Sequence, residues 1–238
     1  MTHSSYRPFH RLAIVGLGAF LPLVLGAWSH PLSRTPDAQA LLTQAIHNTD
    51  TVHTLVHTDT ITLTATRGTA VVNARGQEDE VQNRERDYES VNVQLPGQNG
   101  STRKLHYTVD IIFMNGQTYY RTSVQQNKWK SHSGMSFPDP YVGGWKRART
   151  TVLVPSGAKF AQIGGASSGQ IRMHTSFKTS TIRGTEDLWI SSGKTPYVVR
   201  QDVVQTQGTG ANQIKLHTVT SLGPFNRPMN IQPPTVGA

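Results

Sequence analysis

The fold is decided by residues 105–124, which read LHYTVDIIFMNGQTYYRTSV. Apolar and other side chains alternate from Leu105 to Phe113, and a period of two is typical of a β-strand with one buried face. Asn115 and Gly116 follow this run and tolerate the positive φ angles of a tight hairpin turn. The chain then returns as a second predicted strand, from Thr118 to Val124. The stretch therefore predicts a hairpin within an antiparallel sheet.

Similar alternation is found on both sides of this hairpin. From Thr54 to Thr66, apolar residues share one face and a row of threonines shares the other, which predicts a half-buried strand. Gly, Pro, Asn and Ser separate the other candidate strands, as expected for a chain of hairpins. These further strands are predicted near Val81 to Leu95, Gln170 to Thr181, Glu186 to Ile190, Pro196 to Gln205 and Gln213 to Leu222. Residues 131–169 lack the pattern and are expected to form an irregular excursion, with a short strand around Thr151 to Val154.

One short amphipathic helix precedes the strands, at about Pro36 to His47. Thr35 can cap it and Asp37 favours its positive end. Its apolar residues recur at helical spacing and form one stripe, made of Leu41, Leu42, Ala45 and Ile46. The predicted fold class is therefore mainly β (α+β): a strongly curved antiparallel sheet or half-barrel with an N-terminal helix across one face.

The first 30 residues have the features of an export signal. Arg7 and Arg11 precede an apolar run from Leu12 to Trp28, and Ala27-Trp28-Ser29 suits a signal peptidase. Cleavage there would start the mature chain at His30. The alternative is an uncleaved signal anchor, because the run reaches the lower length limit for a membrane span. Both alternatives place the rest of the chain outside the cytoplasm, secreted or tethered to the membrane.

Composition narrows the possibilities further. The chain has no cysteine, so it has no disulfide and no lipidated cysteine of the bacterial lipoprotein type. Residues 31–238 are enough for a single domain with a sizeable core. The whole chain has a formal net charge of +9, and residues 31–238 keep +7 because residues 1–30 contain two arginines and no acid. Outside the cell, a basic protein favours an anionic membrane surface or a cell-wall polymer over nucleic acid. The alternative is that this charge only keeps the protein soluble.

Catalytic and metal-binding patterns are weak. Gly165 to Gly169 match the Gly-x-Ser-x-Gly elbow of serine hydrolases, with Asp187 or Asp202 and then His217 in the order of that class. However, a strand rather than a helix is expected after Gly169, so a Gly/Ser-rich turn is the better interpretation. We therefore expect a protein that is not an enzyme and has no cofactor.

Clustered histidines and acids are expected to be structural. His47, His53 and His57 could suggest zinc, but two residues four apart on a strand are about 13 Å apart, too far to share one ion. No metal site is expected. Acidic residues at 78–80 and at 85, 87 and 89 are interspersed with arginines, and exposed surface ion pairs are the default expectation there.

Two aromatic and basic segments are candidates for contact with an anionic membrane or polymer. The first lies within residues 131–169 and contains Trp145, Lys146, Arg147 and Arg149. The second is Lys128-Trp129-Lys130, after the central hairpin. An aromatic ring beside several cations suits anionic head groups, although a solvated loop has the same composition.

Several stretches resemble the LolA-like superfamily of envelope lipoprotein and lipid carriers, which includes mycobacterial glycolipid-carrier lipoproteins. The resemblance rests on Ala40-Leu41-Leu42 to Val52-His53-Thr54, residues 115–121 with Lys128-Trp129, Asp187 to Ile190, Thr195 to Arg200, and Phe225 to Pro234. The chain departs from the lipoprotein members in having no lipobox cysteine, and from the family in residues 131–169, which lack the periodicity of its mid-chain helices. The resemblance implies a non-catalytic lipid carrier.

Burial arguments lead to a related expectation. One short helix cannot cover the whole apolar face of a curved sheet, and an uncovered face is suited to acyl chains. The candidate ligand-binding face consists of Leu105, Tyr107, Val109, Ile111 and Phe113. The expected function is binding or transport of a lipid or other amphipathic ligand at the cell envelope. The alternative is an envelope-anchored structural or sensory module without a lipid cavity.

Overall fold

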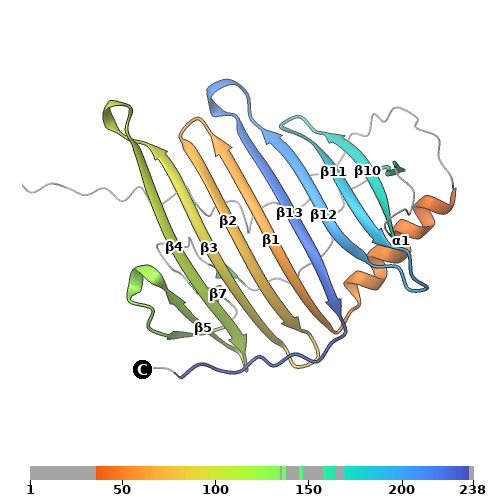
Figure 1. Ribbon diagram of the computed structural model, residues 1–238, viewed down its shortest axis with the longest axis horizontal. Helices are drawn as coiled ribbons and strands as arrows, with labels where there is room; N and C mark the ends of the chain where they lie inside the picture. The colour runs from red at the N-terminus through yellow and green to blue at the C-terminus, as the bar shows by residue number, and fades with distance from the viewer. Residues whose placement is uncertain (1–35, 135, 138–144, 147–157, 164–168, 236–238) are drawn as a thin grey trace, which may run out of the picture.

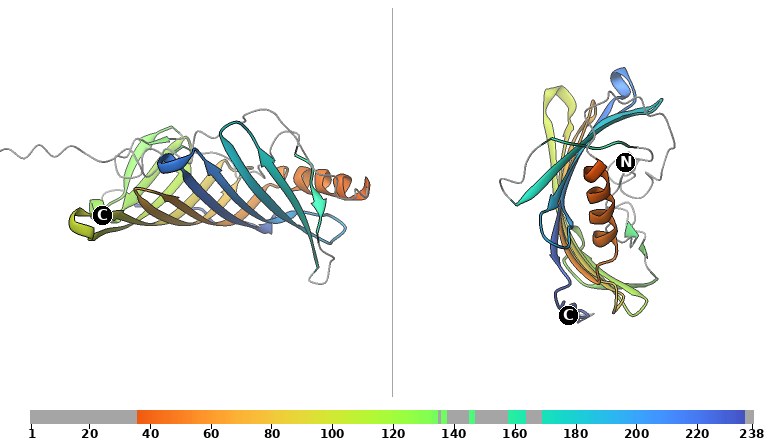
Figure 2. Two further views of the ribbon diagram at one scale, coloured as in Figure 1. Left: turned by 90° about the horizontal axis from the view of Figure 1, so that it is seen from above. Right: turned by 90° about the vertical axis from the view of Figure 1, so that its right-hand side faces the viewer.

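The computed structural model describes residues 36–134, 136–137, 145–146, 158–163 and 169–235. An open antiparallel sheet of 11 strands dominates it, in the order β6-β5-β4-β3-β2-β1-β13-β12-β11-β10-β9. The sheet is curved, and helix α1 lies against its concave face (Figures 1 and 2). The predicted fold class, a curved antiparallel sheet with an N-terminal helix across one face, is confirmed.

The elements follow the chain almost entirely as consecutive hairpins. Their bounds are α1 Pro36–Asp50, β1 Thr54–Ala65, β2 Gly68–Asp79, β3 Arg84–Pro96, β4 Thr102–Met114, β5 Gln117–Thr122, β6 Lys130–Ser133, β7 Ser136–Phe137, β8 Trp145–Lys146, β9 Ala161–Gln162, β10 Gln170–Lys178, β11 Ile182–Ser191, β12 Val198–Gln207 and β13 Ile214–Phe225. Short 3-10 turns are found at Gln98–Gly100, Ser123–Gln125 and Gly210–Asn212. Strands β7 and β8 pair only with each other. One long-range pairing, of β1 with β13, joins the two halves of the large sheet.

The central hairpin forms as predicted. Strands β4 and β5 pair from Met114 opposite Gln117 to Val109 opposite Thr122. Asn115 and Gly116 form the turn with φ angles of 53° and 73°, the positive values that this pair was expected to adopt. The return strand is shorter than predicted, because the chain leaves the ladder after Thr122 in a 3-10 turn.

Strand β2 is the main element that the sequence analysis missed. The predicted strand from Val81 to Leu95 begins later, at Arg84, and the preceding residues Gly68–Asp79 form β2. Polar residues and Gly76 interrupt the apolar alternation of β2, so its period of two is hidden in the sequence. The strands predicted near 170–181, 186–190, 196–205 and 213–222 are present as β10 to β13.

Helix α1 begins at Pro36, as predicted, and continues to Asp50, three residues beyond the expected end. Its last turn is fixed to the sheet through Thr49, whose hydroxyl donates to the Ala45 carbonyl and accepts from the Val198 N–H at 2.9 Å. No helix in the described ranges is long and apolar enough to cross a membrane.

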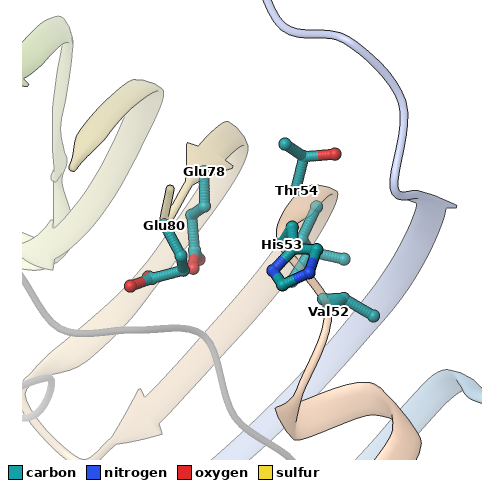
Figure 3. A pocket seen from close by; sticks show the side chains of 6 residues that line it. Val52, His53, Thr54, Glu78 and Glu80 are labelled. Carbon is teal, nitrogen blue, oxygen red and sulfur yellow. The ribbon is translucent and has the colours of Figure 1, made fainter. Parts of the chain in front are cut away.

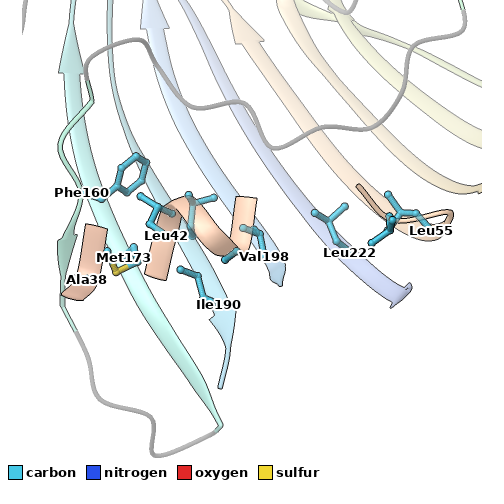
Figure 4. Packing of buried hydrophobic residues seen from close by; sticks show 11 residues of the cluster. Ala38, Leu42, Leu55, Phe160, Met173, Ile190, Val198 and Leu222 are labelled. Carbon is cyan, nitrogen blue, oxygen red and sulfur yellow. The ribbon is translucent and has the colours of Figure 1, made fainter. Parts of the chain in front are cut away.

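The stripe of α1 packs on one end of the concave face. Leu42 and Ala45 are fully buried, and Leu41 and Ile46 pack at the margin, as the helical spacing predicted. Figure 4 shows side chains of this helix-covered cluster beneath α1. Its buried members are Ala38, Leu42, Ala45, Val52, Leu55, Phe160, Met173, Leu188, Ile190, Val198 and Leu222.

A second apolar cluster lies on β3 and β4, away from the helix. This β3–β4 cluster consists of Val91, Val93, Tyr107, Val109 and Ile111, with Ala70, Val72, Leu95 and Tyr120 at its margin. A third, smaller cluster lies on the convex face, where Ile231 of the C-terminal segment packs on Ile112 and Met114. The C-terminal segment therefore supports the sheet from the side opposite the helix.

Candidate functional site

The two apolar clusters of the concave face are separated by a polar group of side chains at the centre of the sheet. In one row across the sheet, Leu222, His57, Gly76, Asp87 and Ile111 are successive cross-strand neighbours. Directly paired residues share a face. Leu222 belongs to the helix-covered cluster and Ile111 to the β3–β4 cluster, so His57 and Asp87 lie between them on the same face.

His57 is the centre of this polar group. Its Nδ1 lies 2.7 Å from Oδ2 of Asp59, while its Nε2 lies 3.3 Å from Oδ1 of Asp87 and 3.7 Å from Oε1 of Glu78. The hydroxyl of Thr220 donates to the other oxygen of Asp59 at 2.5 Å. We call Asp59, His57, Glu78, Asp87 and Glu89 the acid–histidine cluster.

Gly76 makes room for the imidazole. It lies between His57 and Asp87 in the ladder, and a Cβ at this position would stand 1.9 Å from Nε2 of His57 and 2.1 Å from Oδ1 of Asp87. Real Cβ atoms do not approach other atoms so closely. The absence of a side chain on β2 therefore lets the histidine on β1 reach the carboxylate on β3.

The surroundings of His57 keep it protonated. Burial by itself would lower the pKa of His57, but the hydrogen bond to Asp59 and the negative charges of Asp59 and Asp87 raise the pKa to about 10. The imidazolium then balances part of the negative charge that the sheet buries here.

The acids of β2 and β3 are not on the solvent-exposed surface that the sequence analysis expected, and that expectation is wrong. Glu78, Asp79, Glu85 and Asp87 are all buried. Burial, followed by the charges of Asp87 and Asp59, raises the pKa of Glu89 to about 7. The error arose because β2 was not recognised, and only its register places Glu78, Glu85 and Asp87 on the concave face.

A second buried carboxylate lies nearer the helix, on β11. Glu186 is 1% exposed and accepts a hydrogen bond from Nε2 of Gln201 at 2.5 Å. Burial raises the pKa of Glu186 to about 7, although the Gln201 hydrogen bond opposes the shift. The concave face is therefore acidic in two places as well as apolar.

The geometry around His57 does not fit nucleophilic catalysis. In a serine or threonine hydrolase the imidazole is neutral, and its second nitrogen faces a hydroxyl. Here Nε2 of His57 faces Asp87 and Glu78. The Thr220 hydroxyl donates its hydrogen bond to Asp59, which lies on the Nδ1 side of the imidazole. A histidine protonated well above neutral pH cannot act as a general base. The cluster is an ion-pair network.

The remaining candidate catalytic and metal residues are not brought together. Asp187 contacts His174, and Asp202 contacts His217, both on the convex face. The Gly-x-Ser-x-Gly serine, Ser167, lies outside the described residues. His53 is exposed, and His47 lies in the last turn of α1. Among the residues that the structure describes, no group of three or more His, Asp or Glu is arranged to hold a metal ion.

The predicted apolar face of β4 lies where the alternation placed it. Tyr107, Val109 and Ile111 belong to the β3–β4 cluster, and Phe113 is buried on the same side of the strand. Leu105, at the end of this row, is 41% exposed. The five residues thus form a stripe that is buried along most of its length and reaches solvent at one end. Whether this stripe binds a ligand stays a prediction.

The aromatic and basic candidates fall in two places. Trp129 packs partly buried against the convex cluster, and the Arg121 guanidinium lies 4.8 Å from its ring centroid. Trp145 and Lys146 form β8, whereas Arg147 and Arg149 lie outside the described residues, as do residues 151–154 and the export signal. Membrane or polymer contact by these residues stays a prediction.

A small hollow lies where α1 passes into β1. It encloses about 140 Å³ of empty space, part of it open to solvent, and is lined by Val52, His53, Thr54, Leu55, Glu78 and Glu80 (Figure 3). The hollow is small and its lining is partly polar and acidic, so it does not suit an acyl chain, which needs a deeper apolar cavity. Beneath α1, the helix-covered cluster fills the space between helix and sheet.

Comparisons with known proteins give only distant likenesses. No protein-family model matches the chain, and no curated protein matches it. Among solved structures, LprF from Mycobacterium bovis is 13% identical, with 85% of this chain and 99% of that chain covered and a TM-score of 0.45. The Mycobacterium tuberculosis lipoprotein LppX is 11% identical, with 84% and 100% covered and a TM-score of 0.40.

Proposed function

We propose that the protein is an exported, non-catalytic binder of a lipid or other amphipathic ligand at the cell envelope. One observation carries this proposal: the concave face has a second apolar cluster, on β3 and β4, that lies beyond the reach of α1. An ordinary two-layer domain covers its whole apolar face with helices or a second sheet. Here the described helix covers only the end of the concave face that is formed by β10 to β12, because its apolar stripe packs on Met173, Ile190 and Val198.

The ligand chemistry follows from the two kinds of side chain on this face. Each methylene of an acyl chain buried on the β3–β4 cluster contributes about 0.8 kcal/mol, so a long chain can bind without specific polar contacts. The acid–histidine cluster adjoins Ile111 and Val109 through Asp87 and Glu89, and would lie beside the polar end of the ligand. Val109 and Ile111 are at most 1% exposed, so binding requires a rearrangement on this face.

The absence of catalysis is part of the proposal. His57 is held as an imidazolium between carboxylates, and this network has no hydroxyl positioned as a nucleophile. The export signal expected at residues 1–30 and the basic charge of the chain support a place at the cell envelope. Membership of the LolA-like superfamily, which the sequence resemblance implies, is part of the same proposal.

A second candidate is an envelope-anchored structural or sensory module that binds protein or polymer. The observation in its favour is the packing under α1, where Leu42, Met173 and Ile190 are buried in one apolar cluster. In that case the β3–β4 cluster is simply a second core.

Native mass spectrometry of the protein purified from cells that export it separates the two candidates. A lipid binder retains mass additions that disappear after organic extraction and that are identified as lipid in the extract. A protein of bare polypeptide mass, with no lipid in the extract, would favour the interaction module.

A further inference from the structure

The outer half of β4 has a free edge. Strand β4 pairs with β3 along its whole length, from Pro96 opposite Thr102 to Glu85 opposite Phe113. On its other side β5 pairs only with Val109 to Met114, and among the described strands none pairs with residues 102–106 there. Figure 1 shows the β3–β4 hairpin projecting beyond β5.

The hydrogen bond that ends the β4–β5 ladder also shows which backbone groups point outwards. The Thr108 N–H donates to Oγ of Ser123 at 2.9 Å, on the β5 side of the strand. Within a strand, the N–H and C=O of a residue point to one side, and that side alternates at each residue. The register with β3 is unbroken here, so Lys104 and His106 present their N–H and C=O groups to the free edge.

Free edges of this kind accept an added strand unless the sequence prevents it. Thr102 to His106 are all exposed to solvent, where a partner can reach them. Leu105, 41% exposed, continues the apolar stripe of the concave face out to this edge. An apolar residue on an added strand would pack against it.

Charge decides which partner fits. Arg103 and Lys104 precede Leu105 and lie on opposite faces of the strand, and both are exposed. A second copy of this edge would double the number of cations along a short pair of strands, and like charges on paired strands are destabilising. An acidic strand would instead place carboxylates opposite both residues. The edge therefore disfavours self-association and favours an acidic partner.

We propose that the free edge of β4 from Thr102 to His106 binds an extended, acidic segment of a partner protein by β-strand addition. The backbone groups of Lys104 and His106 supply the hydrogen bonds, Leu105 the apolar contact, and Arg103 and Lys104 the charge selectivity. This partner site shares Leu105 with the predicted ligand-binding stripe, but it does not depend on a bound lipid.

A fluorescently tagged peptide, acetyl-GVTVEETG-amide, tests the proposal with the full-length protein. Its sequence places valine opposite Leu105 and glutamates opposite Arg103 and Lys104 in antiparallel register. Two controls are a peptide whose backbone is N-methylated at the residues that face β4, and the charge-reversed peptide GVTVKKTG. Binding is followed by fluorescence polarisation, and hydrogen exchange of the Lys104 and His106 amides is measured by NMR.

Binding of the acidic peptide should slow exchange at Lys104 and His106, and N-methylation should weaken binding by at least about ten-fold, because the loss of backbone hydrogen bonds removes the main contact. The charge-reversed peptide should not bind. Lys104→Pro should abolish binding, because proline lacks the edge N–H but is tolerated at a free edge. Lys104→Thr keeps the N–H and should lose affinity only a few-fold.

The proposal is overturned if the N-methylated peptide binds as well as the unmodified one, because charge alone would then explain binding. It is also overturned if the acidic peptide leaves polarisation and amide exchange unchanged. Both comparisons use the wild-type protein, so they remain decisive if Lys104→Pro does not fold.

Discussion

Gly76 lies directly opposite His57 in the β1–β2 ladder, and a Cβ at Gly76 would stand 1.9 Å from Nε2 of the histidine. Gly76→Ala must therefore displace the imidazole and separate it from Asp87. We expect this variant to lower the free energy of unfolding by about 2–4 kcal/mol, because the displaced histidine leaves buried carboxylates without their counter-charge. Urea denaturation at pH 7 measures the change.

The matched control is Gly193→Ala, where an added Cβ would meet only Thr195 backbone atoms, the nearest at 3.8 Å. This variant should stay within about 0.5 kcal/mol of the wild type. Equal stability of the two alanine variants would contradict the assigned role of Gly76.

Replacing His57 itself should lower the free energy of unfolding more than Gly76→Ala does. His57→Gln keeps a polar side chain but no positive charge, and breaking a buried ion pair by removing one partner costs about 3–5 kcal/mol. The exposed His53 provides the control variant, His53→Gln, which should have little effect. A loss in the His57 variant no larger than in this control would argue against the ion-pair network.

The pH dependence of this loss has a definite sign. The pKa of His57 is raised from 6.5 to about 10 in the folded protein, so its stabilising contribution is complete below pH 6.5 and is lost as pH rises towards 10. The difference in stability between wild type and His57→Gln should therefore narrow between pH 7 and pH 10. A difference that stays constant over this range would mean that the histidine is not protonated in the folded state.

The ionised side chain of Glu186 should lower stability, whereas the ionised side chain of His57 raises it. Burial raises its pKa from 4.5 to about 7, so the folded state holds its proton longer than the unfolded state does, and stability falls as pH rises from 4.5 to 7. Glu186→Gln is neutral at every pH and can still accept the Gln201 hydrogen bond. We expect it to match the wild type near pH 4.5 and to be more stable by about 1–3 kcal/mol above pH 7. Unfolding curves of both proteins at pH 4.5 and pH 8 measure this difference, and a variant that is no more stable than the wild type at pH 8 would contradict the prediction.

The central hairpin depends on Gly116. Its φ of 73° lies in the left-handed region, and an added Cβ would meet no atom within 4 Å, so a substitution here changes backbone strain alone. Gly116→Ala should cost about 1–2 kcal/mol. Gly116→Asn, the matched control, should cost less because asparagine tolerates this region. Equal losses in thermal unfolding would indicate that the turn relaxes to another conformation.

Much of the fold could be predicted from local pattern alone. Alternation along residues 105–113 and the Asn115-Gly116 turn identified β4 and its hairpin, because a period of two and a positive-φ turn are local properties. The same reasoning placed α1 on one face. It missed β2, whose polar residues and Gly76 conceal the alternation.

The acid–histidine cluster could not be predicted in the same way. His57 and Asp59 come from β1 and Asp87 from β3, and only the register of β2 between these strands brings them together. One signal was present: His57 and Asp59 occupy the same alternate positions of their strand as Leu55 and Ile61, on the face expected to be buried. Polar residues in the apolar row of a strand indicate a buried polar network if each of them has a partner. That partner is on another strand, so the local sequence does not reveal it.

Titration of the protein with an environment-sensitive fluorescent fatty acid tests the proposed ligand face most directly. Wild type should enhance the emission of the probe at micromolar protein concentration. Val109→Trp, which fills the β3–β4 cluster, should reduce this enhancement, whereas Thr58→Trp, at an exposed position of the convex face, should not, provided that circular dichroism shows both variants folded. No enhancement with the wild type, or equal enhancement with both tryptophan variants, would contradict ligand binding on the concave face.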